Sequence, residues 1–123
     1  MRLQNISVFA ISAFALQLGN AVAEDRGRWD VEAYEDDLCQ DPTSFTAAST
    51  KLECKSFDGL PEIKSIKADG DNFGATCGWL LYAYEDYDCE GEEWLLQKRN
   101  CLRVGLGDLD SVKSFRVAET PCV

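Results

Sequence analysis

Hydrophobic and polar side chains alternate in residues 29–34, WDVEAY. A period of two is typical of a strand with one buried face, and it points the first, third and fifth residues inward. Residues 79–84, WLLYAY, repeat the arrangement. The pattern therefore predicts two similar half-buried strands, with Trp29 and Trp79 in the core.

Further strands are predicted between and after these two. Glu93–Gln97 would be a second strand of the later group, and its less clear counterpart lies around Ser44–Thr46. Residues 65–68 and 114–117 alternate hydrophobic and basic side chains, as a last strand would. A helical turn is expected at most in Thr46–Leu52. The fold class is therefore all-β.

The similarity between the two groups extends beyond one strand and indicates an internal repeat. RWDVEAYEDDLCQD, from Arg28, aligns with GWLLYAYEDYDCEG, from Gly78, and six residues of each segment are identical. The sequence IKSIKA, from Ile63, aligns in turn with VKSFRV, from Val112. We therefore expect one domain of two copies, 28–68 and 78–118, joined by a turn-rich linker, 69–77.

The beginning of the chain resembles a secretory signal peptide. Arg2 precedes an apolar run, Ile6–Leu18, and the small residues Ala21-Val22-Ala23 follow. This order predicts cleavage after Ala23 and secretion of residues 24–123 to the extracellular space. The alternative, an N-terminal membrane anchor, is disfavoured because the run is short and no basic cluster follows it.

The amino-acid composition argues against several classes of ligand and activity. The six cysteines all follow the predicted cleavage point, and their even number predicts three disulfides in a secreted domain: Cys39, Cys54, Cys77, Cys89, Cys101 and Cys122. A zinc site is disfavoured because the chain has no histidine and no C-x-x-C pair. The net charge of −10 argues against nucleic-acid partners. No cofactor and no enzymatic activity are expected, because the chain lacks a histidine base and a G-x-S-x-G elbow.

The two copies resemble the Greek-key motif of the βγ-crystallin superfamily. Its hairpin pattern is an aromatic residue, a second aromatic five positions on, a glycine two further on, and a serine about twenty residues later. Copy two matches with Tyr84, Gly91 and Ser114, and copy one with Tyr34, Asp41 and Ser65. The resemblance implies a disulfide-stabilised sandwich of two Greek keys.

Cysteine stands in place of the second aromatic residue in both copies, which suggests that a disulfide holds each folded hairpin. Asp41 replaces the glycine of copy one, a position that usually needs a positive φ. Six cysteines allow many pairings, and the symmetry of the copies favours Cys39 with Cys54 and Cys89 with Cys101. Cys77 would then pair with Cys122, because the fourth strand of a Greek key returns beside the first.

Calcium is the best-known ligand of this superfamily, but both copies lack most of its signature. The pattern is two Asn or Asp, two variable residues, a hydroxyl residue and the motif serine. Before Ser114 only Asp110 remains of the two acids, and Lys113 occupies the hydroxyl position; before Ser65, Lys64 does so and neither acid remains. A lysine repels a cation, so we expect no metal site, or at most a degenerate one at Asp110.

These observations favour a secreted, non-enzymatic, monomeric protein that acts as a toxin-like, antimicrobial or effector module on a protein or cell-surface target. A proteinase inhibitor is the alternative, with Phe57–Glu62 or Leu102–Leu109 as the exposed loop, and a structural extracellular protein with weak calcium binding is another. The acidic strip, made of Glu85, Asp86, Asp88, Glu90, Glu92 and Glu93, could be a recognition surface or only a solvated hairpin. Tyr82, Tyr84 and Tyr87, with Leu80, could form an aromatic contact patch, although the hairpin role is favoured for Tyr84. Lys98-Arg99 is either a dibasic processing site or an ordinary surface pair.

Overall fold

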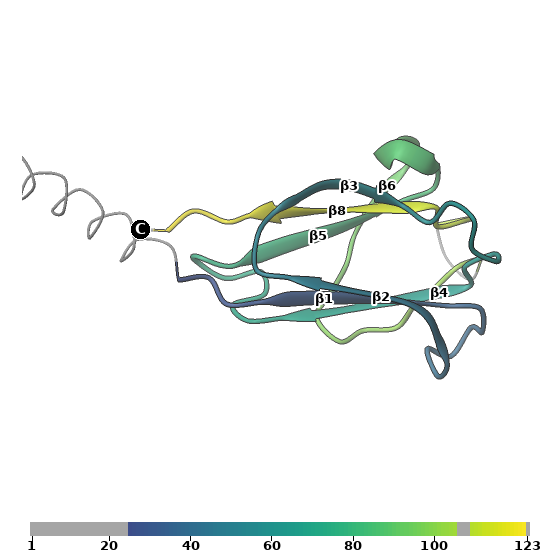
Figure 1. The fold of residues 1–123 in the computed structure, drawn as a ribbon, viewed down its shortest axis with the longest axis horizontal. Helices are drawn as coiled ribbons and strands as arrows, with labels where there is room; N and C mark the ends of the chain where they lie inside the picture. Colours follow the sequence, from purple (N-terminus) through teal and green to yellow (C-terminus); the bar gives the residue numbers. More distant parts are fainter. Residues whose placement is uncertain (1–24, 106–108, 123) are drawn as a thin grey trace, which may run out of the picture.

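Two four-stranded antiparallel sheets face each other and form a sandwich (Figure 1). The computed structural model describes residues 25–105 and 109–122, so the expected signal peptide lies outside the described residues. The prediction of an all-β fold is confirmed. Within the described residues, no helix has the length and apolar character needed to cross a membrane.

Each sheet joins strands from both copies of the repeat. The first sheet has the order β2-β1-β4-β7 and the second has the order β3-β8-β5-β6. The elements are β1 (Trp29–Tyr34), β2 (Pro42–Ala48), β3 (Leu52–Ser56), β4 (Ser65–Gly70), β5 (Trp79–Tyr84), the 3₁₀ turn η1 (Tyr87–Cys89), β6 (Glu93–Leu95), β7 (Leu102–Arg103) and β8 (Ser114–Glu119).

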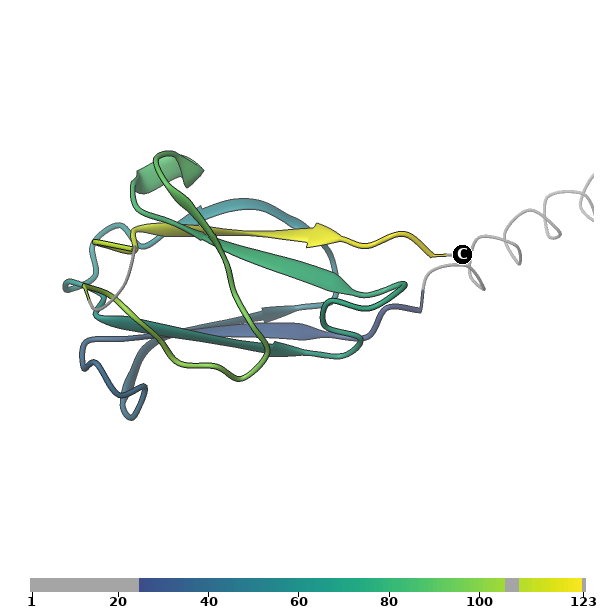
Figure 2. The ribbon, with the colours of Figure 1, turned by 180° about the vertical axis from the view of Figure 1, so that it is seen from behind.

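The third strand of each copy leaves its own sheet and pairs in the other. Strand β3 of copy one pairs with β8 of copy two, with Ser56 opposite Ser114. Strand β7 of copy two pairs with β4 of copy one, with Ser65 opposite Arg103. The chain between β2 and β3 arches from one sheet to the other (Figures 1 and 2). Each sheet therefore depends on both copies.

The core lies between the sheets and is made by the inward positions that the alternation predicts. Trp29 and Trp79 are buried, as are the third and fifth residues of their strands. Phe115 of β8 stacks on Phe57 at a ring-centroid distance of 5.6 Å and meets the edge of Trp29 at 6.1 Å. Aromatic packing of this kind fills the space between two sheets and contributes much of the burial in a small domain.

Three disulfides cross-link the described residues, and two of them differ from the expected pairs. Cys39 is bonded to Cys101 and Cys54 to Cys89, so the pairs Cys39–Cys54 and Cys89–Cys101 were wrong. Equivalent cysteines do make equivalent bonds. However, Cys54 lies in β3, which pairs in the same sheet as β5 and β8 of copy two. Both of these bonds therefore join a cysteine of copy one to a cysteine of copy two.

The third bond, Cys77–Cys122, agrees with the expectation. Some element boundaries differ from the predicted ones. Strand β4 continues through Gly70, so the linker is shorter than 69–77, and Thr46–Ala48 belongs to β2 rather than to a helical turn. The short helical segment is η1 instead. In η1 the left-handed φ values of Asp88 and Cys89, 61° and 57°, produce a tight turn that periodicity does not reveal.

Candidate functional site

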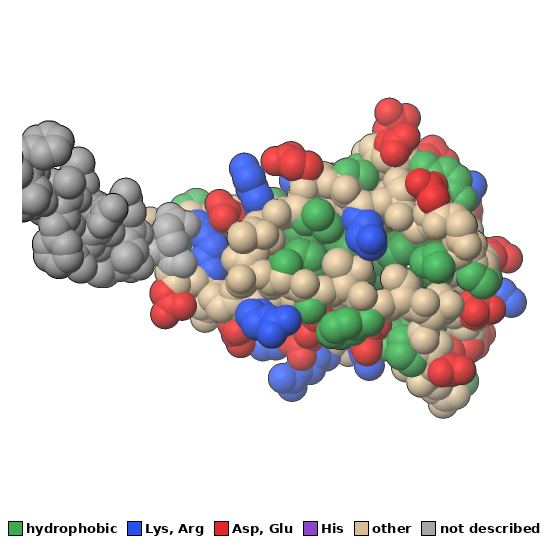
Figure 3. All heavy atoms as spheres, viewed as in Figure 1, with side chains coloured by type: hydrophobic (Ala, Val, Ile, Leu, Met, Phe, Trp, Pro, Cys, Tyr) green, Lys and Arg blue, Asp and Glu red, His purple; other side chains and the backbone are tan. Residues whose placement is uncertain are grey.

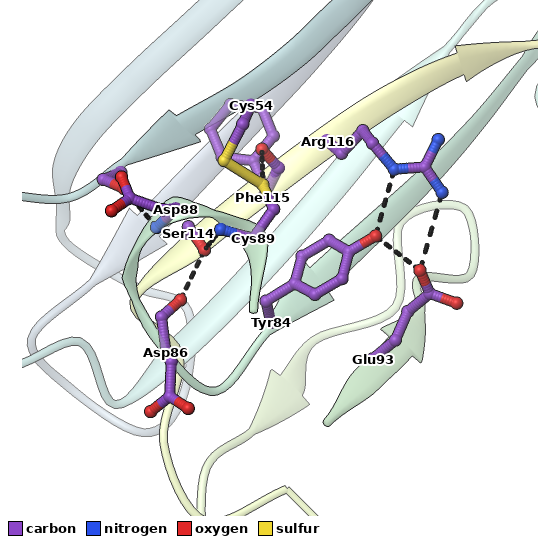
Figure 4. The surroundings of a disulfide bond; sticks show 10 residues. Cys54, Tyr84, Asp86, Asp88, Cys89, Glu93, Ser114, Phe115 and Arg116 are labelled. Carbon is purple, nitrogen blue, oxygen red and sulfur yellow. Dashed lines mark hydrogen bonds and ion pairs between the residues drawn. A yellow bond between two sulfur atoms is a disulfide. The ribbon is translucent and has the colours of Figure 1, made fainter. Parts of the chain in front are cut away.

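A buried serine closes the folded hairpin of copy two (Figure 4). Ser114, at the start of β8, donates a hydrogen bond to the carbonyl of Asp86 at 2.5 Å. Its Oγ accepts one from the backbone N–H of Cys89 at 2.8 Å. Because Cys89 is also bonded to Cys54 of β3, the hairpin is attached to its own copy and to a strand of the other copy.

Copy one repeats this arrangement with its own serine. Ser65 donates to the carbonyl of Asp36 at 2.6 Å and accepts from the N–H of Cys39 at 3.3 Å. Cys39 is bonded in turn to Cys101, the equivalent of Cys54. The hairpin and serine residues that carry the resemblance therefore lie together in both copies.

The two hairpins differ where copy one lacks the glycine. Gly91 has a φ of 79°, and a Cβ there would collide with the Asp86 carboxylate. Asp41 is not one of the described residues whose backbone has a positive φ. The expectation that position 41 needs a positive φ was therefore wrong. Asp36 instead accepts the N–H groups of Leu38, Gln40 and Asp41 at 2.8, 3.1 and 3.0 Å. These bonds, the Leu38 bond foremost, lower the pKa of Asp36.

Tyr84 belongs to the structural framework rather than to an exposed aromatic patch. Its hydroxyl donates to Glu93 and accepts from Arg116 Nε at 3.0 Å, as Figure 4 shows. Burial, followed by the hydrogen bond to Glu93, raises the pKa of Tyr84. Arg116 also lies 4.6 Å from the ring centroid of Tyr82. Of these hairpin tyrosines, Tyr87 is the exposed one, at 45%.

Tyr87 borders a groove at the junction of the two copies, which hydrophobic and polar side chains line together. The groove has a volume of about 450 Å³. Phe57 and Ile63 are buried, whereas Leu60 and Tyr87 are exposed by 38% and 45%. One wall is the loop between β3 and β4, and the other comes from η1 and the segment before β8. The lining residues are Phe57, Leu60, Pro61, Glu62, Ile63, Tyr87, Ser111, Val112 and Lys113.

Both walls of the groove are held by contacts to the sandwich. Phe57 donates its backbone N–H to the carbonyl of Lys113 at 2.9 Å, which joins the two walls directly. The N–H of Asp88 donates to Ser56 Oγ at 2.8 Å, beside the Cys54–Cys89 bond. The Lys113 ammonium lies 5.2 Å from the Tyr87 ring centroid, a favourable cation–π distance. The groove is therefore preformed, which lowers the entropic cost of binding.

The groove itself is lined by one carboxylate, Glu62, and one lysine, Lys113, and further carboxylates lie in the same segments of the chain. Asp58 lies in the loop, and Asp86 and Asp88 flank Tyr87. Figure 3 shows acidic side chains, with hydrophobic and some basic ones among them, at the end of the molecule where Figure 1 shows η1. We call six residues the acidic rim: Asp58, Glu62, Glu85, Asp86, Asp88 and Asp110. The lysines in or next to the same segments are Lys55, Lys64 and Lys113.

The position of the degenerate calcium signature forms part of this rim. The backbone N–H of Asp110 donates to Glu85 Oε2 at 2.9 Å, and the Ser111 hydroxyl donates to the Glu85 carbonyl at 2.8 Å. Lys113, which stands where the signature has a hydroxyl, lies over Tyr87. In the part of the chain that the structure describes, no three His, Cys, Asp or Glu residues are grouped to hold a metal ion.

The other predicted surface features lie elsewhere. Arg99 Nε is 2.9 Å from Asp69 Oδ2, and Lys98 forms a β-bridge with Ala68, so the basic pair is held against β4. Part of the Leu102–Leu109 loop lies outside the described residues, whereas Phe57–Glu62 forms a groove wall. Sequence reasoning did not single out Ile63 and Val112, although both are the hydrophobic residue two positions before the motif serine.

Comparisons with models of protein families, with curated proteins and with solved structures found no match to this chain.

Proposed function

We propose that this chain is a secreted, non-enzymatic binding module of the βγ-crystallin superfamily, acting as a toxin-like, antimicrobial or effector protein on a macromolecular target. The observation that carries the proposal is the preformed groove where the two copies meet, in which hydrophobic side chains form the larger part of the lining residues. Leu60 and Tyr87 present hydrophobic surface there on walls fixed by a disulfide. Exposed hydrophobic groups on a rigid support are typical of recognition sites.

Assignment to the superfamily rests on the motif residues. In each copy the tyrosine, the Glu-Asp pair and the distant serine meet at one folded hairpin. The exchange of β3 and β7 between the sheets supports a duplication of one motif. In a Greek key the fourth strand lies beside the first, which fits the pairing of β4 with β1 and of β8 with β5.

The residues that line the groove are better suited to binding than to catalysis. The side chains that line it are mainly hydrophobic, and its lysine, Lys113, already contacts the Tyr87 ring. General acid–base catalysis requires a positioned pair of titratable groups at the reacting atoms. An extracellular location is supported by the three disulfides in a small domain, since such bonds persist in oxidising compartments.

The test is to apply the purified, oxidised protein to bacterial, fungal and plant cells and to measure growth and cell death. We expect an effect on one of these cell classes, and we expect Tyr87→Ser to reduce it at least tenfold. Phe45→Ser is the matched control, because Phe45 of β2 is also an exposed aromatic residue, at 63%, and lies outside the groove. No effect on any cell class, or equal losses in both variants, would refute the proposal.

Inhibition of a proteinase is a second candidate, favoured by one observation. The loop residues 58–62 are exposed, while Phe57 and Ile63 at the two ends of the loop are buried. A loop fixed at both ends could enter a protease cleft without losing much conformational entropy. Sub-micromolar inhibition in a panel of serine, cysteine and metalloproteinases would favour this candidate over the first.

A further inference from the structure

We infer that the partner of the groove is a protein segment that carries a hydrophobic anchor residue flanked by lysine or arginine. This inference rests on the proposed function, because it takes the groove to be the binding site. The structure combines an apolar floor with the acidic rim, and these two features select different parts of one ligand.

The apolar part of the ligand follows from the floor. Phe57, Ile63 and Val112 form buried hydrophobic surface at the groove. A hydrophobic side chain that enters the groove would pack on this floor, and the surface that it removes from water would be mainly the exposed parts of Leu60 and Tyr87. Anchors of this kind, placed in a preformed pocket, carry most of the free energy of binding in many interfaces.

The charge of the ligand follows from the rim. Its six carboxylates outnumber the three lysines in or next to the same segments, although the lining itself holds one of each, Glu62 and Lys113, and the whole chain has a net charge of −10. One of the three, Lys113, already lies over the Tyr87 ring. A cationic segment would gain from complementary potentials, which speed association and favour the correct partner.

The same charges disfavour other occupants. A second copy of this chain would bring two acidic rims together, and like charges at an interface cost several kcal/mol. Anionic lipid and nucleic acid are repelled for the same reason. A neutral apolar ligand could fill the groove, but it would leave the negative charge of the rim uncompensated.

The experiment selects peptides from a phage-displayed random dodecapeptide library on the oxidised, immobilised protein. We expect enrichment of sequences with a large hydrophobic residue between lysines or arginines. A synthetic peptide of that sequence should bind in calorimetry, and its affinity should fall about tenfold between low and high salt, because charge pairs near a surface are screened. No enriched sequence, or enrichment of neutral or acidic sequences, would refute the inference.

Variants locate the peptide on the surface. Tyr87→Ser and Leu60→Ser should each weaken binding at least tenfold, and Asp58→Asn with Glu62→Gln should reduce both affinity and its salt dependence. Phe45→Ser should leave binding unchanged, whereas loss of binding only in Phe45→Ser would refute the inference. If Tyr87→Ser abolishes the cellular effect but no cationic peptide is selected, the binding site stands and the partner class is wrong. If Tyr87→Ser keeps the cellular effect, the proposed function of the groove itself is wrong.

Discussion

The buried serine of copy two should be one of the most sensitive polar positions in the domain. Replacing Ser114 by alanine removes the hydroxyl that links the Asp86 carbonyl at 2.5 Å with the Cys89 N–H at 2.8 Å. Both backbone groups then lose this partner at a site where Ser114 itself is fully buried. The Cys54–Cys89 bond holds the hairpin in place, so the half-buried Cys89 cannot easily rearrange to give its N–H a new partner.

The expected loss follows from the cost of leaving buried polar groups unsatisfied, which is about 1–3 kcal/mol for each group. The Asp86 carbonyl lies toward the exposed turn and can be hydrated, so we expect a total of about 2–3 kcal/mol for Ser114→Ala. For a domain of this size, that is a fall in Tm of roughly 10 °C. Ser65→Ala should cost less, about 1–2 kcal/mol, because the Cys39 N–H lies farther from its serine, at 3.3 Å.

Urea unfolding of the oxidised protein, followed by tryptophan fluorescence, measures these differences. Ser44→Ala is the control, since the Ser44 hydroxyl makes no hydrogen bond with any described residue, and it should change stability by less than about 0.5 kcal/mol. If Ser114→Ala were no more destabilising than Ser44→Ala, the serine would not support the hairpin and the reasoning would fail.

Three further predictions concern the framework. Peptide mapping without reduction should find Cys39 linked to Cys101, and a link to Cys54 would contradict the described topology. Asp36→Asn should destabilise the protein near neutral pH, because the pKa of Asp36 is lowered in the folded state. The ionised carboxylate stabilises the fold at pH values above the unfolded-state pKa, and this contribution is lost as the pH falls through the folded-state pKa. Urea titrations at several pH values would show it, and a difference that persists in acid would contradict the assignment. Phe115→Ala should cost about 3–5 kcal/mol, measured as a shift of the urea midpoint, since its ring is fully buried between the sheets; a cost below about 1 kcal/mol would be inconsistent with the described packing.

The local part of this fold could be predicted from the sequence. Alternation identified the buried faces of β1 and β5, because each strand has one face in the core and a side-chain period of two. The repeat identified Ser65 and Ser114 as equivalent. The sequence did not decide between a contact role and a solvated position for Tyr87, and in the structure its exposed ring lines the groove.

The long-range part could not be predicted in the same way. The pairing of Cys39 depends on which sheet receives β3 and β7, and β7 spans only Leu102–Arg103. A strand of two residues has no periodicity to detect, and symmetry between the copies is equally satisfied by bonds within a copy and by bonds between copies. The groove was missed because its walls come from segments that meet only after the sheets form.

The exchange of β3 and β7 also has a consequence for the origin of the molecule. One copy alone supplies three strands to one sheet and a fourth strand that needs another sheet, so it can complete neither. Two identical copies can complete both. A single-motif ancestor of this architecture would therefore need a second chain to complete both sheets, with the counterparts of Cys39–Cys101 and Cys54–Cys89 as covalent links between the two chains. Fusion of the two genes would then have replaced a concentration-dependent assembly by a fold that one chain completes for itself.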